Sequence, residues 1–137
     1  MIDHVLDTVE AVSPAKVVVV IGPDMEDVGR VCRHHTIVVQ EERLGTGHAV
    51  LQAKETLEGF AGNILVVFGD TPLLTADTIL LMKRALDDNR KNILAVLGFK
   101  AQIPKGYGRI LCKIDGTIIA CASCSYGYSS MSSPIYS

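Results

Sequence analysis

The nearly unbroken β-branched run from Lys16 to Ile21, apolar from Val17 onward, constrains the fold of this chain more than any other feature. A run of β-branched residues without polar alternation is typical of a strand that is covered on both faces, as strands are in parallel sheets. The segment Asn63 to Phe68 repeats this pattern and ends abruptly at Gly69-Asp70. The two runs predict buried strands of one parallel sheet.

The segments between and after these runs predict alternating helices and strands. Apolar residues at three-and-four spacing indicate helices over residues 2–12, 25–32, 48–57 and 76–89, and further strands are predicted over 36–40 and 92–99. Thr75 is the predicted N-cap of the last helix. Asp115-Gly116 between Arg109–Ile114 and Thr117–Ala122 predicts a hairpin with a type I′ turn. Residues 1–122 therefore read as an α/β three-layer domain, and residues 123–137, rich in Ser and Tyr, as a poorly ordered tail.

The charge and the apolar runs exclude several classes of protein. Lys and Arg number 13 against 15 Asp and Glu, for a formal charge of −2, and no basic run is present. A protein that binds nucleic acid or a membrane surface needs a concentrated positive field, so neither partner is expected. The apolar runs are too short to cross a membrane, and the first residues lack the pattern of a secretion signal. We therefore expect a cytoplasmic protein with reduced cysteines.

The segment Gln40 to Ala49 follows the second predicted strand and reads Gln-x-x-x-Leu-Gly-Thr-Gly-His-Ala. Ligands of open α/β sheets gather beyond the carboxyl ends of the strands, where glycines let the backbone approach a ligand and the helix start suits a phosphate. The alternative is a tight strand-to-helix connection without a ligand. His48 either orients this loop, meets a phosphate or serves only as a structural hydrogen-bonding group.

Two more segments carry candidate chemistry. In Gly69-Asp70-Thr71-Pro72-Leu73 a carboxylate directly follows a buried strand, where it is well placed to bind Mg²⁺ or, alternatively, to cap its own turn. Gly106-Tyr107-Gly108-Arg109 can present backbone amides and a ring to a sugar or base, or form an ordinary bend before the hairpin.

Together, in this order and at these separations, the three motifs closely resemble bacterial UDP-N-acetylglucosamine pyrophosphorylases, the uridylyltransferase half of the bifunctional GlmU proteins. The resemblance runs from about Ile2 to Ile119. It implies a nucleotide-diphospho-sugar transferase (Rossmann-like) fold and Mg²⁺-dependent transfer of a uridylyl group from UTP to N-acetylglucosamine-1-phosphate, which gives UDP-N-acetylglucosamine. By the same resemblance Gln40 recognises uracil, Gly45 and Thr46 line the nucleotide, Asp70 binds the metal, and Gly108 contacts the amino sugar.

Parts of the family pattern have no counterpart in these 137 residues. The family opens with a strand and a loop of the type Leu-x-x-Gly-x-Gly-Thr-x-Met, followed by a Pro-Lys pair, which bind the triphosphate. It also continues past the hairpin to a sugar-contacting Glu and a second metal ligand. We therefore expect an incomplete fold, truncated at both ends, with exposed strand edges that favour self-association.

Three functional interpretations remain open from the sequence. The first is a catalytically impaired relative that keeps weak nucleotide or Mg²⁺ binding. The second is an active uridylyltransferase that a separate partner chain completes. The third is a zinc or redox site at Cys121-x-x-Cys124, with Cys112 and His34 or His35 as further candidates, but a single Cys-x-x-Cys pair is a weak signal for it.

Overall fold

The computed structural model describes residues 1–88, 91–103 and 105–122, and these residues divide into two compact units. The first unit ends at Ala95 and the second begins at Val96. The predicted tail over residues 123–137, which includes Cys124, lies outside the described residues. Each unit is considered by itself.

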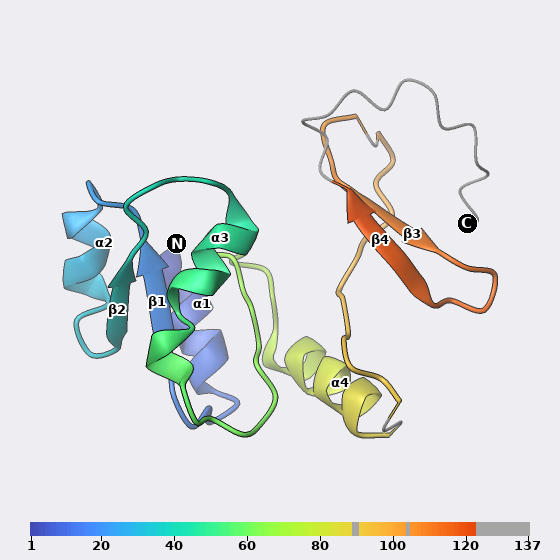
Figure 1. Cartoon of the computed structure of the whole chain (residues 1–137), viewed down its shortest axis with the longest axis horizontal. Helices are drawn as coiled ribbons and strands as arrows, with labels where there is room; N and C mark the ends of the chain where they lie inside the picture. The colour runs from blue at the N-terminus through green and yellow to red at the C-terminus, as the bar shows by residue number, and fades with distance from the viewer. Residues whose placement is uncertain (89–90, 104, 123–137) are drawn as a thin grey trace. The chain divides into compact units, whose positions relative to one another are not determined.

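Up to residue 52 the first unit alternates helices with strands, as the sequence predicts, but no strand is described between residues 53 and 75 (Figure 1). Its elements are, in order, α1 (Ile2–Glu10), β1 (Val18–Ile21), α2 (Glu26–Val31), β2 (Thr36–Val39), α3 (Thr46–Gln52), the 3₁₀ helix η1 (Glu55–Leu57) and α4 (Ala76–Asp87). Strands β1 and β2 pair in parallel, with Val18 opposite Thr36 and Ile21 opposite Val39. The parallel pairing predicted from the apolar run is therefore confirmed.

The buried core of the first unit is small and draws one residue from each of five parts of the chain. Its apolar members are Val5, Val19, Cys32, Ala53 and Ile79. They come from α1, β1, α4 and the residues that follow α2 and α3. Full burial of an aliphatic side chain of this size contributes about 1.5–3 kcal/mol. The core of the first unit therefore rests on single buried residues rather than on a continuous apolar layer.

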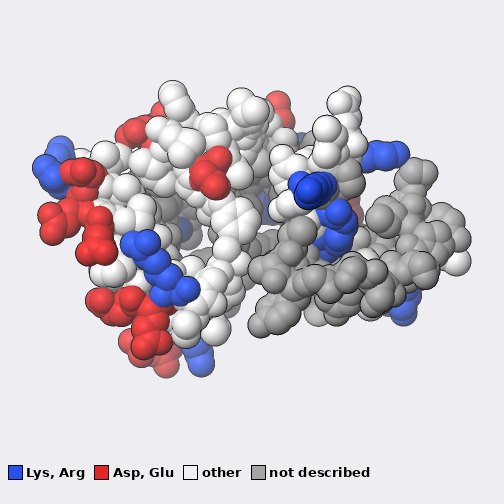
Figure 2. Space-filling view, turned by 90° about the horizontal axis from the view of Figure 1, so that it is seen from above, with Lys and Arg blue, Asp and Glu red and all other residues white. Residues whose placement is uncertain are grey.

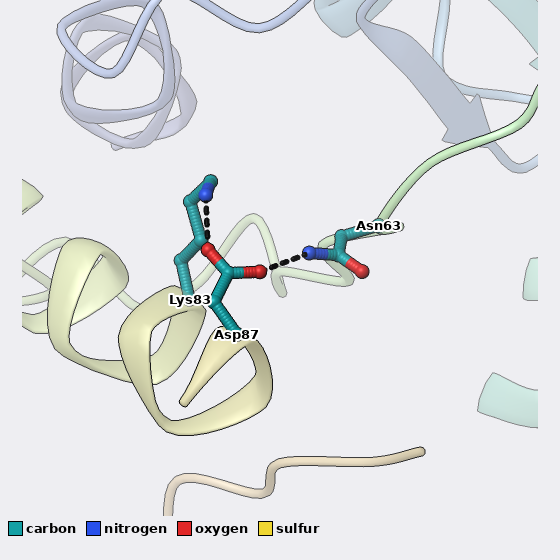
Figure 3. Close-up of polar contacts among 3 residues, drawn as sticks. All are labelled: Asn63, Lys83 and Asp87. Atoms are coloured by element: carbon teal, nitrogen blue, oxygen red, sulfur yellow. Dashed lines mark hydrogen bonds and ion pairs between the residues drawn. The ribbon is translucent and has the colours of Figure 1, made fainter. Parts of the chain in front are cut away.

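Local contacts define both ends of α4. The backbone N–H of Thr78 donates to Oγ1 of Thr75 at 3.3 Å, which confirms Thr75 as the N-cap. In the last turn, Nδ2 of Asn63 donates to Oδ1 of Asp87 at 3.4 Å, and the Lys83 ammonium pairs with the other carboxylate oxygen (Figure 3). The Lys83 hydrogen bond, supported by that from Asn63, lowers the pKa of Asp87. These contacts attach the start of segment 63–68 to α4.

Two predicted strands are absent from the described residues. Residues 63–68 and 92–99 form no ladder with any described strand. Ile64 is 60% exposed and Phe68 is 53% exposed, so the third strand predicted to be buried lies open instead. A run of this kind becomes a strand only when a neighbour supplies hydrogen bonds and covers its faces, and the described part of the chain contains no such neighbour beside it. In place of the larger sheet of the predicted three-layer domain, the described residues contain two sheets of two strands each.

The second unit contains an antiparallel hairpin formed by β3 (Arg109–Cys112) and β4 (Ile118–Ala122). The hairpin was predicted, but its type I′ turn was wrong. Gly116 has a φ of 83°, whereas Asp115 is not among the residues with positive φ. The N–H of Gly116 donates to the Lys113 carbonyl at 3.0 Å, and that of Lys113 donates to the Thr117 carbonyl at 2.8 Å. This is a three-residue loop with glycine in the left-handed position, and Oδ1 of Asp115 accepts from the Thr117 N–H at 2.9 Å.

The surface charge is mixed, as the balanced composition predicts. Figure 2 shows acidic side chains with basic ones beside them over the end of the first unit that carries α2, where Arg30 pairs with Asp27. Among the described residues, every helix is too short or too polar to span a bilayer.

Candidate functional site

The carboxyl ends of β1 and β2 are joined into one surface by the residues that follow each strand. The N–H of Gln40 donates to the Ile21 carbonyl at 2.7 Å, which extends the pairing of the two strands by one step. The Arg43 side chain then folds over the end of β1. A Cβ added at Gly22 would lie 2.9 Å from Nη2 of Arg43, so the guanidinium rests directly on that glycine. The loop after β2 therefore covers the strand ends, which is where open α/β sheets bind ligands.

Gly45 turns this loop into α3 through a conformation that other residues avoid. Its φ is 103° and its ψ is 179°, a combination found almost only in glycine. An added Cβ would meet nothing within 4 Å, so glycine is needed for the backbone angles and not for space. The Gly45 carbonyl accepts the first helical hydrogen bond, from the Ala49 N–H at 3.1 Å, and Thr46 begins the helix.

Gln40 is bound to this glycine turn by its side chain. Nε2 of Gln40 donates to the Gly45 carbonyl at 3.2 Å and lies 2.9 Å from Nδ1 of His48. On the other side of the imidazole, Nε2 of Gln52 lies 3.0 Å from Nε2 of His48. All three side chains are half-buried. The structure thus brings the predicted nucleotide residues Gln40, Gly45 and Thr46 together.

Gln52 was missed by the sequence analysis. Its four-residue spacing from His48 places both side chains on the same face of α3, which is the signal that could have identified it.

Asp70 lies in a separate turn of the first unit, which is closed by Thr71 and not by the capping of backbone N–H groups weighed for Asp70. Oγ1 of Thr71 donates to the Phe68 carbonyl at 2.7 Å, and the Thr71 N–H reaches the same carbonyl at 3.3 Å. Within residues 1–88, 91–103 and 105–122 no group donates to the Asp70 carboxylate, which is exposed. Behind it, Gly69 packs on Ile2 of α1, with Cδ1 3.0 Å from an added Cβ.

An exposed carboxylate without a protein partner fits Mg²⁺, which uses one or two carboxylates and takes its other ligands from phosphates and water. Over the described part of the chain, no three Asp, Glu, His or Cys residues gather closely enough to bind a metal without a substrate. A magnesium ion at Asp70 would therefore depend on a bound phosphate for most of its ligands.

Gly108, the predicted sugar contact, belongs to the second unit. Its carbonyl accepts from Nη1 of Arg109 at 3.2 Å, and the Tyr107 carbonyl accepts from the same atom at 2.6 Å. Arg109 is therefore occupied by its own bend. The Tyr107 ring packs edge-to-face on Phe99, with centroids 5.1 Å apart, so it is a packing residue. The Gly108 N–H has no hydrogen-bond partner among the described residues.

The described cysteines differ in burial, and His35 forms an ion pair outside the glycine turn. Cys32 is buried, and burial, with a smaller effect from Asp3, raises the pKa of its thiol. Cys112 and Cys121 are exposed free thiols, while Cys124, the second member of the predicted pair, lies outside the described residues. His35 pairs with Glu10 at 3.4 Å.

Comparisons with known proteins agree with this arrangement of motifs. The family model of the MobA-like NTP transferase domain matches residues 1–112. The chain is 49% identical over 116 residues to the bifunctional protein GlmU of Paramagnetospirillum magneticum, a match that covers 85% of this chain and 26% of that protein. It is 45% identical over 122 residues to a GlmU of Streptococcus pyogenes serotype M12, covering 87% of this chain and 29% of that protein. For the GlmU of Rhodospirillum rubrum the identity is 44% over 111 residues, covering 81% of this chain and 25% of that protein.

The matched region is thus between a quarter and a third of the length of these relatives. The resemblance found from the motifs is confirmed. Because the family model extends over most of the sequence, including the strand-end loop and the Asp70 turn, this chain belongs to the MobA-like NTP transferase domain family.

Proposed function

We propose that this chain binds a uridine nucleotide with Mg²⁺ and is related in function to UDP-N-acetylglucosamine pyrophosphorylase. The observation that supports the proposal most strongly is the hydrogen bond between Gln40 and Gly45, because it joins a base-recognising amide to a backbone turn suited to a nucleotide. The relatives named above are bifunctional GlmU proteins, and uridylyl transfer is the activity carried over to this chain as a proposal. The proposed domain covers residues 1–122.

The Gly45 carbonyl already accepts two hydrogen bonds, but Oε1 of Gln40, the Asp70 carboxylate and the N–H groups of Gly45, Thr46 and Gly108 have no partner among the described residues. The Oε1 atom of Gln40 would accept from uracil, and the backbone of Gly45 and Thr46 would lie along the nucleotide. The Asp70 carboxylate would bind Mg²⁺, and the Gly108 N–H would donate to the amino sugar. Magnesium, when bound, would neutralise charge on the phosphate oxygens.

In the proposed reaction a phosphate oxygen of N-acetylglucosamine-1-phosphate forms a bond to the α-phosphorus of UTP. The bond from that phosphorus to the bridging oxygen breaks, and pyrophosphate leaves with its electron pair. The side chains of this domain bind and orient the two phosphates without forming a covalent intermediate. Positioning and charge stabilisation supply the rate in reactions of this class.

The charge near the glycine turn predicts weak binding and slow turnover by this chain alone. Glu41 and Glu42 precede the turn and are exposed, and Arg43 is the cation between them and Gly45. The turn therefore carries one more negative than positive charge beside a strongly anionic triphosphate. A partner chain that supplies cations and donors to the triphosphate would raise the rate, since each preorganised donor is typically worth a large factor.

The proposal is tested by titrating UTP into the chain with Mg²⁺, while pyrophosphate release is measured in parallel with N-acetylglucosamine-1-phosphate. We expect saturable binding in the high micromolar to millimolar range and pyrophosphate release that barely exceeds the background. Rapid steady turnover by the chain alone would contradict the impaired interpretation. Absence of saturable UTP binding would contradict the whole proposal.

We also propose that the chain self-associates through segment 63–68. This segment is apolar, exposed and without ladder hydrogen bonds among the described residues, and such an edge readily pairs with a second copy. Light scattering at micromolar concentration is expected to give a mass above that of a monomer. A Val66→Lys variant, which adds charge to the segment, should lower that mass, and a wild-type chain that stays monomeric would contradict the proposal.

A further inference from the structure

We infer that His48 is a positioning residue that fixes the orientation of the Gln40 amide and thereby makes the site select uracil over cytosine. The inference rests on the proposed nucleotide binding and adds to it the residue that decides which base is accepted. It starts from the contact of His48 with a glutamine on each side, Gln40 at Nδ1 and Gln52 at Nε2.

Only one arrangement of protons around this ring keeps the hydrogen bond between the Gln40 amide and the Gly45 carbonyl. A neutral imidazole has one N–H and one lone pair, so it cannot accept from an amide nitrogen at both ring atoms. One glutamine must present its oxygen. Turning the Gln40 amide would place its oxygen 3.2 Å from the Gly45 carbonyl oxygen, where a hydrogen bond now exists. Turning the Gln52 amide gives up only a 3.4 Å contact to the His48 carbonyl.

The favoured arrangement therefore has the proton on Nε2 of His48, donated to the oxygen of Gln52, and a lone pair on Nδ1. Nδ1 then accepts one hydrogen of the Gln40 amide while the Gly45 carbonyl accepts the other. Both hydrogens of Gln40 are used, so Oε1 is its only remaining polar group. Gln40 can therefore accept a hydrogen bond from the base but cannot donate one to it.

An acceptor at this point distinguishes the two pyrimidines. On the pairing edge of uracil only N3–H donates, so Oε1 of Gln40 can bind it there. Cytosine has a lone pair at N3 and donates on this edge only through its exocyclic N4 amino group, so Oε1 held opposite N3 would face another acceptor. Without His48, one amide hydrogen of Gln40 would lose its partner and the Gly45 carbonyl alone would hold the amide, so turning it to donate to cytosine would cost one hydrogen bond fewer.

Two substitutions separate this role from simple packing. His48→Phe keeps a planar ring but removes the Nδ1 acceptor, whereas His48→Asn offers an amide oxygen near the place of Nδ1. One hydrogen bond corresponds to about a two- to tenfold change in affinity. We expect the ratio of Kd for CTP to Kd for UTP to fall by about that factor in His48→Phe and to recover in His48→Asn. Circular dichroism would verify that both variants fold.

The orientation itself is measured without a nucleotide. Nitrogen NMR of ¹⁵N-histidine-labelled chain, at about pH 8 where imidazole is ordinarily neutral, should show a protonated Nε2 and an unprotonated Nδ1 for His48. Its signal is the one missing from the His48→Asn spectrum. A proton on Nδ1 would overturn the inference.

Equal discrimination by wild type and His48→Phe, with UTP still bound, would overturn the inference as well. If the wild-type chain binds neither nucleotide, the proposed function and the role in selectivity both fail. In that case the nitrogen shifts still decide the orientation of Gln40.

Discussion

Replacing Gly45 by alanine should destabilise the chain for a purely conformational reason. An added Cβ meets no atom within 4 Å, so no clash contributes to the effect. What remains is the backbone, held at a φ of 103° and a ψ of 179°. A non-glycine residue in this region costs about 1–3 kcal/mol.

Gly47→Ala is the matched control, because it lies two positions further in the same turn. Its added Cβ also meets nothing within 4 Å, but its φ is not positive and it lies within α3. Alanine in a helix is favoured over glycine by up to about 1 kcal/mol. The two substitutions add the same methyl group and should act in opposite directions.

Urea unfolding followed by circular dichroism measures the difference. With a slope of about 1.5 kcal/mol per molar urea, Gly45→Ala should lower the midpoint by about 0.7–2 M, while Gly47→Ala should leave it unchanged or raise it. A parallel UTP titration should show weaker binding for Gly45→Ala, since the Gly45 carbonyl holds the Gln40 amide. An unchanged midpoint for Gly45→Ala, or an equal fall for both variants, would refute the reasoning.

Three further predictions follow from single contacts. Asp70→Asn should leave the urea midpoint unchanged, because the carboxylate has no described donor, and should weaken UTP binding in Mg²⁺ far more than in EDTA; an equal loss in both buffers would argue against a metal role. Thr75→Ala should cost about 1 kcal/mol of stability in the same unfolding assay, with Thr75→Ser close to wild type, because only the capping oxygen is removed; equal losses would show that the cap is not the cause. The lowered pKa of Asp87 means that its contribution to stability is present above the ordinary carboxyl pKa and is lost as the pH falls through the lowered value. The stability difference between wild type and Asp87→Asn should therefore be constant near neutrality and shrink below about pH 4, and a difference that persists in acid would contradict the assigned cause.

The sequence predicted those parts of the fold that depend on local pattern and nearby pairing. The apolar run at β1, the helical stripes and the Thr75 cap each act over a few residues or between adjacent elements, and the structure contains them. The strand predicted at 63–68 is absent because an apolar pattern indicates only that a segment can form a buried strand. Whether it does depends on neighbouring strands, and the described chain provides none beside it. The predicted type I′ turn was wrong because Asp-Gly occurs both in two-residue type I′ turns and in three-residue loops. In this loop only Gly116 has a positive φ, and the Asp115 side chain accepts from the Thr117 N–H.

The candidate site was predictable in its residues but not in its connections. The motif names Gln40, Gly45 and His48, yet no pattern states that Gln40 and His48 share a hydrogen bond or that Gln52 lies on the far side of the ring. Such contacts depend on the path of the loop from β2 to α3, which the Gly45 backbone angles determine.

The central claim is that the glycine turn and the Asp70 turn serve one ligand. The most direct test follows the backbone amide signals of the chain by NMR during titration with UTP and Mg²⁺. We predict that the amides of Gly45, Thr46 and Asp70 shift together and saturate with one Kd. Shifts confined to one of the two turns, or separate saturation of each, would contradict the account.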